Sequence, residues 1–323
     1  MKKRFKIGLP IIMLFVLLSI VPYFINIPSY KEFSQVDLFP ESNVHEVEGI
    51  KIHYRIWLPR EESLGKVLLV HGLGGSTFSW INNVEYLRDA GYAVVAVDLP
   101  GFGYSSRNPN INHSQENRSD LLWQLLNTIE ENEIQDKSGG WVLAGHSMGG
   151  GTVTAMAIDN PGKTKALVLV DGALFGADRK LTAWALKYPP FNRWLQVILR
   201  HSLINIDNIE SFLTSAYGKK PSESQVSGCL LPLRQPGTER ALADFARTAS
   251  NVDVDPLEEV EIPILGIWGE KDTWVPYQEG EKIKTKLPRM ELEVISDAAH
   301  CPMETHPAEF NQIFIDYLKK IYE

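Results

Sequence analysis

A single serine stands among small residues in the stretch AGHSMGGG, residues 144–151. Ser147 lies between Gly145 and Gly149 in a Gly-x-Ser-x-Gly pattern. A serine hydroxyl becomes a good nucleophile only when a nearby base takes its proton, and a tight strand-to-helix turn exposes it for attack. Glycines permit such a turn because they have no β-carbon. The pattern is weak alone, so a strand before it, a helix after it and partners elsewhere must support it.

The segments around this serine alternate between apolar strand-like runs and amphipathic helical runs. We expect strands at 51–58, 66–72, 92–101, 141–147, 165–173, 263–272 and 291–296, and helices at 77–91, 115–134, 148–162, 277–286 and 307–323. Strands that alternate with helices at this pitch form parallel βαβ units. The sequence therefore predicts an α/β fold, doubly wound, with a mainly parallel central sheet and helices on both faces.

One segment, residues 175–250, interrupts the alternation with helical spacing and no buried-strand run. It predicts a helical insertion that covers the sheet as a cap, so the core comprises residues 31–174 and 251–323. The apolar side chains of the insertion are expected to bind an apolar acyl or aryl group. They could equally pack the cap onto the core. These candidate substrate-binding residues are Trp184, Phe191, Trp194, Leu195 and Ile198.

Five motifs occur in a consistent order along the chain: HGLGG (71–75), DLPGFGYS (98–105), GHSMG (145–149), GEKDTWVP (269–276) and HCPMETHP (300–307). Together they resemble the α/β-hydrolase superfamily, in its capped serine-hydrolase branch with esterases and lipases. The resemblance implies a triad of Ser147 as nucleophile, His300 as base and Asp272 as acid. It also implies an oxyanion hole formed by the backbone N–H groups of Leu73 and Met148. The second of these groups would begin the helix after the serine.

Other polar residues compete for these roles. Asp171 ends a predicted strand, and some relatives place the acid there, but the Gly-x-x-Asp-x-x-Val-Pro signature favours Asp272. We expect His71 to hold its loop by hydrogen bonds. We expect His146 to point away from the nucleophile, because neighbouring side chains diverge at a sharp turn.

A serine at this turn predicts acyl transfer to water. A membrane anchor would place the site near lipids or incoming esters, which favours a carboxylic ester hydrolase of the carboxylesterase or lipase type. A carbon–carbon hydrolase, a thioesterase and a non-catalytic ligand-binding protein remain alternatives, because a fold alone does not choose among them. No Cys-x-x-Cys or His-Glu-x-x-His spacing occurs. We therefore expect neither a metal nor a cofactor.

Charge and hydropathy are divided unevenly along the chain. Residues 31–323 carry 28 basic and 40 acidic side chains, which argues against a nucleic-acid partner. Residues 7–27 hold no charge and follow four basic residues, so residues 1–30 are predicted to be a single membrane span with the catalytic domain outside the cytoplasm. A cleaved signal sequence and secretion are the alternative. Cys229 and Cys301 form a bridge only if the fold brings them together.

Overall fold

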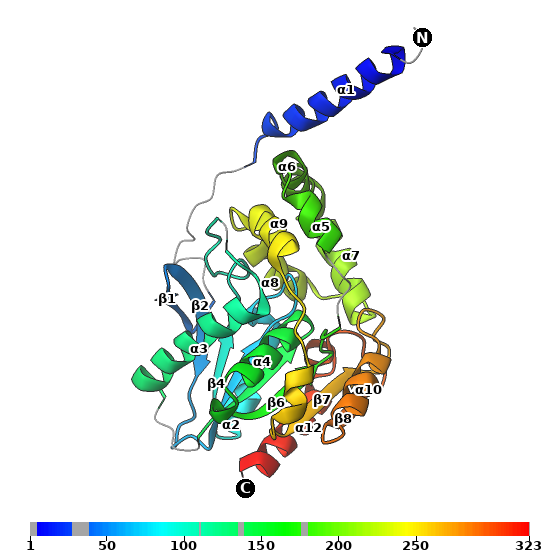
Figure 1. Cartoon of the computed structure of the whole chain (residues 1–323). Coiled ribbons are helices and arrows are strands. Elements are labelled where there is room, and N and C mark those ends of the chain that lie inside the picture. The colour runs from blue at the N-terminus through cyan, green and yellow to red at the C-terminus, as the bar shows by residue number, and fades with distance from the viewer. Residues whose placement is uncertain (1–4, 28–38, 110, 135–138, 176–179, 323) are drawn as a thin grey trace.

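The chain folds around an eight-stranded sheet, which the computed structural model describes within residues 5–27, 39–109, 111–134, 139–175 and 180–322 (Figure 1). The strands are β1 Ser42–Val47, β2 Ile50–Trp57, β3 Gly65–Val70, β4 Tyr92–Val97, β5 Trp141–His146, β6 Thr164–Val170, β7 Ile264–Gly269 and β8 Glu291–Ile295. Their order is β1-β2-β4-β3-β5-β6-β7-β8. β2 pairs antiparallel with β1 and with β4, and the other neighbours are parallel. The predicted mainly parallel sheet is confirmed.

Helices cover both faces of this sheet, as doubly wound folds require. Strand β3 shows why, because Leu68 and Val70 enter one apolar core while Val67 and Leu69 enter the other. The first core includes side chains from α3, α4 and α10, and the second includes side chains from α2 and α12. The core helices are α2 Val84–Asp89, α3 Gln115–Asn132, α4 Met148–Asp159, α10 Tyr277–Lys286, α11 Pro302–Thr305 and α12 Pro307–Tyr322, with 3-10 turns η3 Thr77–Trp80, η4 Pro161–Lys163 and η6 Asp255–Glu259.

The segment between β6 and β7 is helical, and Figure 1 shows its helices gathered at one end of the sheet. It contains α5 Lys180–Leu186, α6 Pro189–Ile198, a π-helical turn η5 Leu199–Leu203, α7 Ile206–Tyr217, α8 Glu223–Leu233 and α9 Thr238–Thr248. We refer to residues 180–248 as the helical insertion. Its role as a lid, and the domain boundaries at 174 and 250, stay predictions.

The apolar N-terminal run does not form the predicted membrane span. Its helix, α1 Phe5–Ile20, has 16 residues and ends where Pro22 enters the 3-10 turn η1 Val21–Tyr23. Sixteen residues extend about 24 Å, less than the hydrocarbon thickness of about 30 Å. None of the helices in the described part of the chain is long and apolar enough to cross a bilayer. The membrane location predicted from the sequence is therefore wrong.

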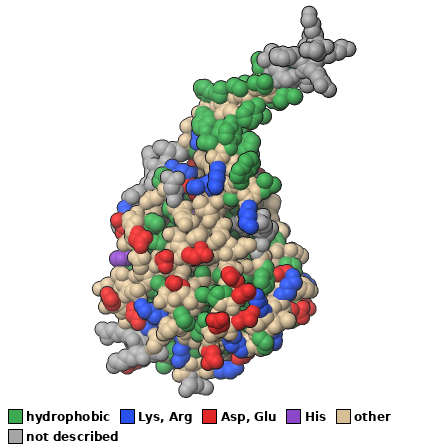
Figure 2. Space-filling view, in the orientation of Figure 1, with side chains coloured by type: hydrophobic (Ala, Val, Ile, Leu, Met, Phe, Trp, Pro, Cys, Tyr) green, Lys and Arg blue, Asp and Glu red, His purple; other side chains and the backbone are tan. Residues whose placement is uncertain are grey.

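Helix α1 projects from the body of the molecule and carries exposed apolar side chains (Figure 2). It contacts the helical insertion, because the Trp194 indole donates to the Leu18 carbonyl at 2.8 Å and the Phe15 and Tyr188 rings stack. The basic residues 2–4 and the predicted boundary at residue 30 lie outside the described residues.

Candidate active site

Ser147 occupies a strained turn between β5 and α4. Its φ of 50° and ψ of −118° are unusual for a residue with a side chain. The neighbouring glycines explain how the turn fits. A β-carbon on Gly145 would lie 2.3 Å from the Gly149 carbonyl oxygen, and one on Gly149 would lie 2.5 Å from the Val70 oxygen. The Gly-x-Ser-x-Gly pattern is thus a packing requirement of the strand–turn–helix unit.

Ser147, His300 and Asp272 form a continuous chain of hydrogen bonds. The His300 Nδ1 lies 2.7 Å from an Asp272 carboxylate oxygen, and the His300 Nε2 lies 3.0 Å from the Ser147 hydroxyl. Burial opposes ionisation of Asp272, but the hydrogen bond and charge of His300 lower the pKa of this carboxyl below its usual value. An ionised Asp272 accepts the Nδ1 proton, which leaves Nε2 free to accept the proton of the serine.

Asp171, the competing acid, stands next to Asp272 rather than replacing it. One Asp171 oxygen accepts the Gly269 N–H at 3.0 Å, and the residue adopts a φ of 43°. Burial and the neighbouring Asp272 charge raise the pKa of Asp171 well above its usual range. The pKa of Asp272 moves in the opposite direction, so Asp171 is the carboxyl of the pair that holds its proton more strongly.

The side chains of Asp171, Asp272 and His300 lie close enough together to be considered as a metal site. One possible ligand atom from each lies within 4.8 Å of the others. Their chemistry does not fit a cation well. The Nδ1 proton already lies between His300 and Asp272, and burial disfavours the charged form of Asp171 that a cation would need. The Oδ2 atom of Asp171 is buried and has no hydrogen-bond partner among the described residues.

The two predicted oxyanion donors belong to neighbouring loops. Met148 is the first residue of α4, so its backbone N–H has no partner within the helix. Leu73 follows Gly72, whose carbonyl accepts both the His71 Nδ1 at 2.7 Å and the Gly75 N–H at 3.1 Å. These bonds fix the loop that carries the Leu73 amide. The assignment of both amides as oxyanion donors stays a prediction.

His71 has the structural role expected from the sequence. Its Nε2 accepts the Leu99 N–H at 3.1 Å while its Nδ1 donates to the Gly72 carbonyl. Burial lowers the pKa of His71, which keeps the ring neutral and able to accept at one nitrogen and donate at the other. The ring thus ties the loop after β3 to the loop after β4.

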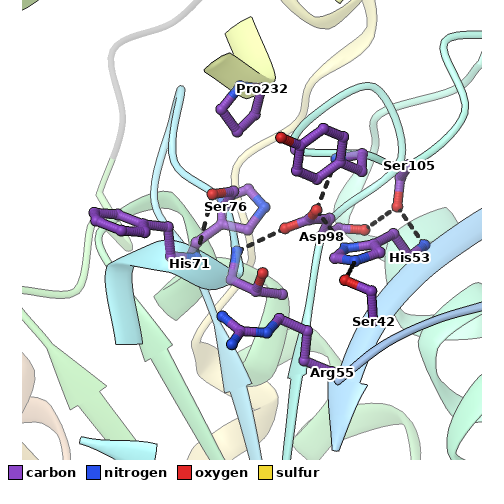
Figure 3. A network of polar contacts seen from close by, with 12 residues as sticks. Ser42, His53, Arg55, His71, Ser76, Asp98, Ser105 and Pro232 are labelled. Atoms are coloured by element: carbon purple, nitrogen blue, oxygen red, sulfur yellow. Dashed lines mark hydrogen bonds and ion pairs between the residues drawn. The ribbon is translucent and has the colours of Figure 1, made fainter. Parts of the chain in front are cut away.

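A second connection between these loops is a buried network around Asp98 (Figure 3). Its carboxylate accepts the Thr77 N–H at 2.6 Å, the Tyr104 N–H at 2.7 Å and the His53 Nδ1 at 2.6 Å. His53 also contacts the Ser42 hydroxyl at 2.7 Å through Nε2. Although burial opposes ionisation, the neighbouring His53 lowers the pKa of Asp98. The DLPGFGYS motif therefore holds the loop after β3 in place through Asp98, a role that its sequence did not reveal.

His146 contributes to the position of the base, which the sequence did not predict. Its Nε2 donates to the His300 carbonyl at 2.8 Å, and the two rings lie 4.8 Å apart. Burial, followed by the nearby His300, lowers the pKa of His146 to about 3. The ring is neutral at neutral pH and supports the loop of His300 through this hydrogen bond.

Apolar side chains lie beside the base at the surface. The Trp274 ring lies 5.2 Å from the His300 ring, and the Phe212 ring from α7 meets Trp274 edge-on at 4.8 Å. Leu73, Phe212 and Trp274 are each between 40% and 45% exposed. Trp274 belongs to the GEKDTWVP motif, but only the fold brings it together with Phe212 and the base.

The five residues predicted to bind substrate occupy another part of the helical insertion. Trp184 on α5 is 70% exposed, while Phe191 and Ile198 on α6 are each 48% exposed. Phe191 packs edge-on against Tyr188, and Trp194 bonds to α1. Leu195 also lies on α6 and is partly buried. Their role in substrate binding stays a prediction. Cys229 and Cys301 are free thiols.

The chain has relatives among curated proteins and solved structures. Curated relatives include the "Uncharacterized hydrolase YugF" of Bacillus subtilis, 25% identical over 84% of this chain and 96% of that protein. A 2-hydroxy-6-oxononadienedioate/2-hydroxy-6-oxononatrienedioate hydrolase of Burkholderia vietnamiensis is 25% identical over 86% of this chain and 94% of its own. A solved esterase of Thermogutta terrifontis superposes with a TM-score of 0.68 at 23% identity, over 87% of this chain and 97% of its own. Residues 66–307 match the profile of the alpha/beta hydrolase fold, and the chain belongs to this family.

Proposed function

We propose that this hydrolase cleaves carboxylic esters through an acyl-enzyme on Ser147. The observation that carries the proposal is the chain of hydrogen bonds from the serine hydroxyl through His300 to an ionised Asp272. A binding protein has no use for a serine held in a strained turn beside a correctly oriented base. The arrangement therefore favours turnover over ligand binding alone.

The proposed reaction has two halves. In the first, His300 takes the proton from Ser147 as its oxygen attacks the ester carbonyl, and then gives that proton to the leaving alcohol. In the second, His300 takes a proton from water, which attacks the acyl-enzyme, and returns it to Ser147 as the acid is released. Asp272 holds the ring in the required tautomer and stabilises the imidazolium in both halves.

Charge that develops on the carbonyl oxygen would be stabilised by the backbone amides of Leu73 and Met148. Each oxyanion donor is worth roughly 3 to 4 kcal/mol in systems where one has been removed. The exposed apolar surface of Leu73, Phe212 and Trp274 is matched to an apolar acyl or aryl group. A small neutral ester with one such group is the substrate class that we propose.

Carbon–carbon bond hydrolysis is the second candidate. It is favoured by the curated relatives named 2-hydroxy-6-oxononadienedioate hydrolase, such as that of Burkholderia vietnamiensis. The name describes a substrate with two carboxylates. Leu73, Phe212 and Trp274, the exposed side chains that we assign to this surface, carry no positive charge to pair with such a dianion, and for this reason we place ester hydrolysis first.

The deciding experiment compares both substrates with one enzyme. The full chain is assayed with p-nitrophenyl esters of increasing acyl length and with a 2-hydroxy-6-oxodienoate, and Ser147→Ala serves as the control. We expect ester turnover that disappears in the variant, while circular dichroism shows an unchanged fold. Turnover of the dienoate alone would replace our proposal with the second candidate, and full ester activity in Ser147→Ala would refute the nucleophile.

A further inference from the structure

The end of α7, in the helical insertion, contacts the loops of both the acid and the base. The carbonyl of Ala216 accepts the backbone N–H of His300 at 2.9 Å. One residue earlier, the Ser215 hydroxyl accepts the indole N–H of Trp274 at 3.0 Å. The Asp272 carboxylate in turn accepts the backbone N–H of Trp274 at 2.7 Å. The last turn of α7 is therefore in contact with the loop of His300 and the loop of Asp272.

A buried hydrogen bond fixes this turn to the core. The Tyr217 hydroxyl, 2% exposed as a residue, donates to the carboxyl of Glu304 at 2.5 Å, and Glu304 is 8% exposed. Glu304 lies on α11, directly after the loop of His300. The chain then leaves α7 at Gly218, whose φ of 66° suits glycine, and a β-carbon there would lie 3.1 Å from that of Ala299. The bond thus lies immediately beside the Ala216–His300 contact.

We propose that Tyr217 and Glu304 are positioning residues for catalysis, which hold the last turn of α7 against the base loop and thereby set the place of His300. The backbone of His300 is held on one side by His146 and on the other by Ala216. Without the Tyr217–Glu304 bond, this end of α7 keeps apolar packing and, on the α11 side, the bond from the Lys219 ammonium to the Thr305 carbonyl at 3.1 Å. A displacement of about 1 Å in reacting groups can cost about a hundredfold in rate. Neither Tyr217 nor Glu304 touches the substrate.

The proposal rests on the proposed ester hydrolysis for its kinetic assay, so a second readout is needed that does not depend on the substrate. The rate at which a fluorophosphonate labels Ser147 serves this purpose, because labelling requires the base but no ester. Full-length Tyr217→Phe, Glu304→Leu, Glu304→Gln and the double variant Tyr217→Phe/Glu304→Leu are compared with the wild type in both assays. Gln keeps an acceptor oxygen for Tyr217, and Leu does not.

The matched control is Tyr54→Phe. The Tyr54 hydroxyl donates to Glu133 at 2.6 Å, so this variant removes a similar tyrosine–glutamate bond that lies on β2, away from α7. We expect it to label at the wild-type rate. Circular dichroism and unfolding midpoints establish that each variant is folded under the assay conditions.

We expect Tyr217→Phe and Glu304→Leu each to lower kcat and the labelling rate about tenfold, with KM within about threefold, because the reacting groups are displaced and not the binding surface. Glu304→Gln should retain most of the rate. The double variant should be no slower than Glu304→Leu, since both changes break one bond. The proposal is overturned if folded Tyr217→Phe is labelled at the wild-type rate. It is also overturned if the wild-type protein itself is not labelled. A wild type that is labelled but cleaves no ester refutes the proposed function only.

Discussion

Replacing Glu304 by Gln should change how the stability of this protein depends on pH. Glu304 is buried against α7, α8, η3 and its own loop, where it faces Tyr217, Cys229, Ser79 and Cys301. Burial raises the pKa of its carboxyl from 4.5 to about 7, although hydrogen bonds with Tyr217 and Ser79 partly offset this rise. Gln fills nearly the same volume and does not titrate.

The size and sign of the effect follow from the two pKa values of Glu304. Below pH 4.5 the carboxyl is protonated in both the folded and the unfolded chain, so it carries no ionisation penalty. Between pH 4.5 and about 7 the unfolded chain releases this proton and the folded chain keeps it, so stability falls as pH rises. Above pH 7 the full penalty is present, and the rise in pKa corresponds to about 3 kcal/mol.

Urea unfolding of the wild type and of Glu304→Gln between pH 4.5 and 8.5 measures this ionisation penalty. The other titrating groups are common to both proteins, so they largely cancel in the difference between the two free energies of unfolding. We expect that difference to shift in favour of the variant by about 3 kcal/mol across the range. In Tyr217→Phe the pH range over which ionisation of Glu304 costs stability should move to higher pH. The reason is that this variant loses a hydrogen bond that lowers the pKa of Glu304. A difference that stays flat with pH would refute the reasoning.

Four further substitutions test the site. Asp272→Asn should lower kcat about 10⁴-fold, because the tautomer of the base is no longer enforced. Asp171→Asn should keep kcat within about tenfold, since burial already disfavours the charged form of this carboxyl and an amide of similar size replaces it. The reverse ranking in ester assays would exchange their roles. Gly149→Ala should lower the free energy of unfolding by about 3 kcal/mol or more, because its β-carbon meets backbone; an unchanged urea midpoint would contradict this. Asp98→Asn should lower the free energy of unfolding by about 3 to 5 kcal/mol, because buried donors lose their acceptor. A variant as stable as the wild type in urea would show that the network is dispensable.

Features of the fold that rest on local sequence were predictable. Helix α10 spans residues 277–286 as expected, and the glycines around Ser147 indicated a strand–turn–helix unit because their effect is confined to a few neighbouring residues. The edge strand β1 was missed, since its alternating exposed and buried residues resemble a polar loop. The apolar N-terminal run indicated a hydrophobic segment, but it did not reveal that the helix ends at Ile20.

Features of the site that rest on distant contacts were not predictable. The Tyr217–Glu304 bond joins residues 87 positions apart, and the His146–His300 bond joins residues 154 apart. No spacing rule connects such pairs, because their meeting depends on how complete elements pack. Asp171 and Asp272 illustrate the same limit. The Gly-x-x-Asp-x-x-Val-Pro signature favoured Asp272, but only the folded arrangement shows that burial raises the pKa of Asp171 while His300 lowers the pKa of Asp272.

The attachment of α7 to the base loop bears on how this protein could be re-engineered or could diversify. A designer who grafts a relative's whole insertion onto this sheet would also exchange the carbonyl of Ala216 and the hydroxyl of Ser215, on which the loops of His300 and Trp274 depend. Chimeras joined before α5 and after α9 should therefore fold yet turn over slowly. Exchanges confined to the exposed side chains of α5 and α6, such as Trp184 and Phe191, leave those two atoms in place. Substrate selectivity could therefore vary through α5 and α6 without displacing the loops of His300 and Trp274.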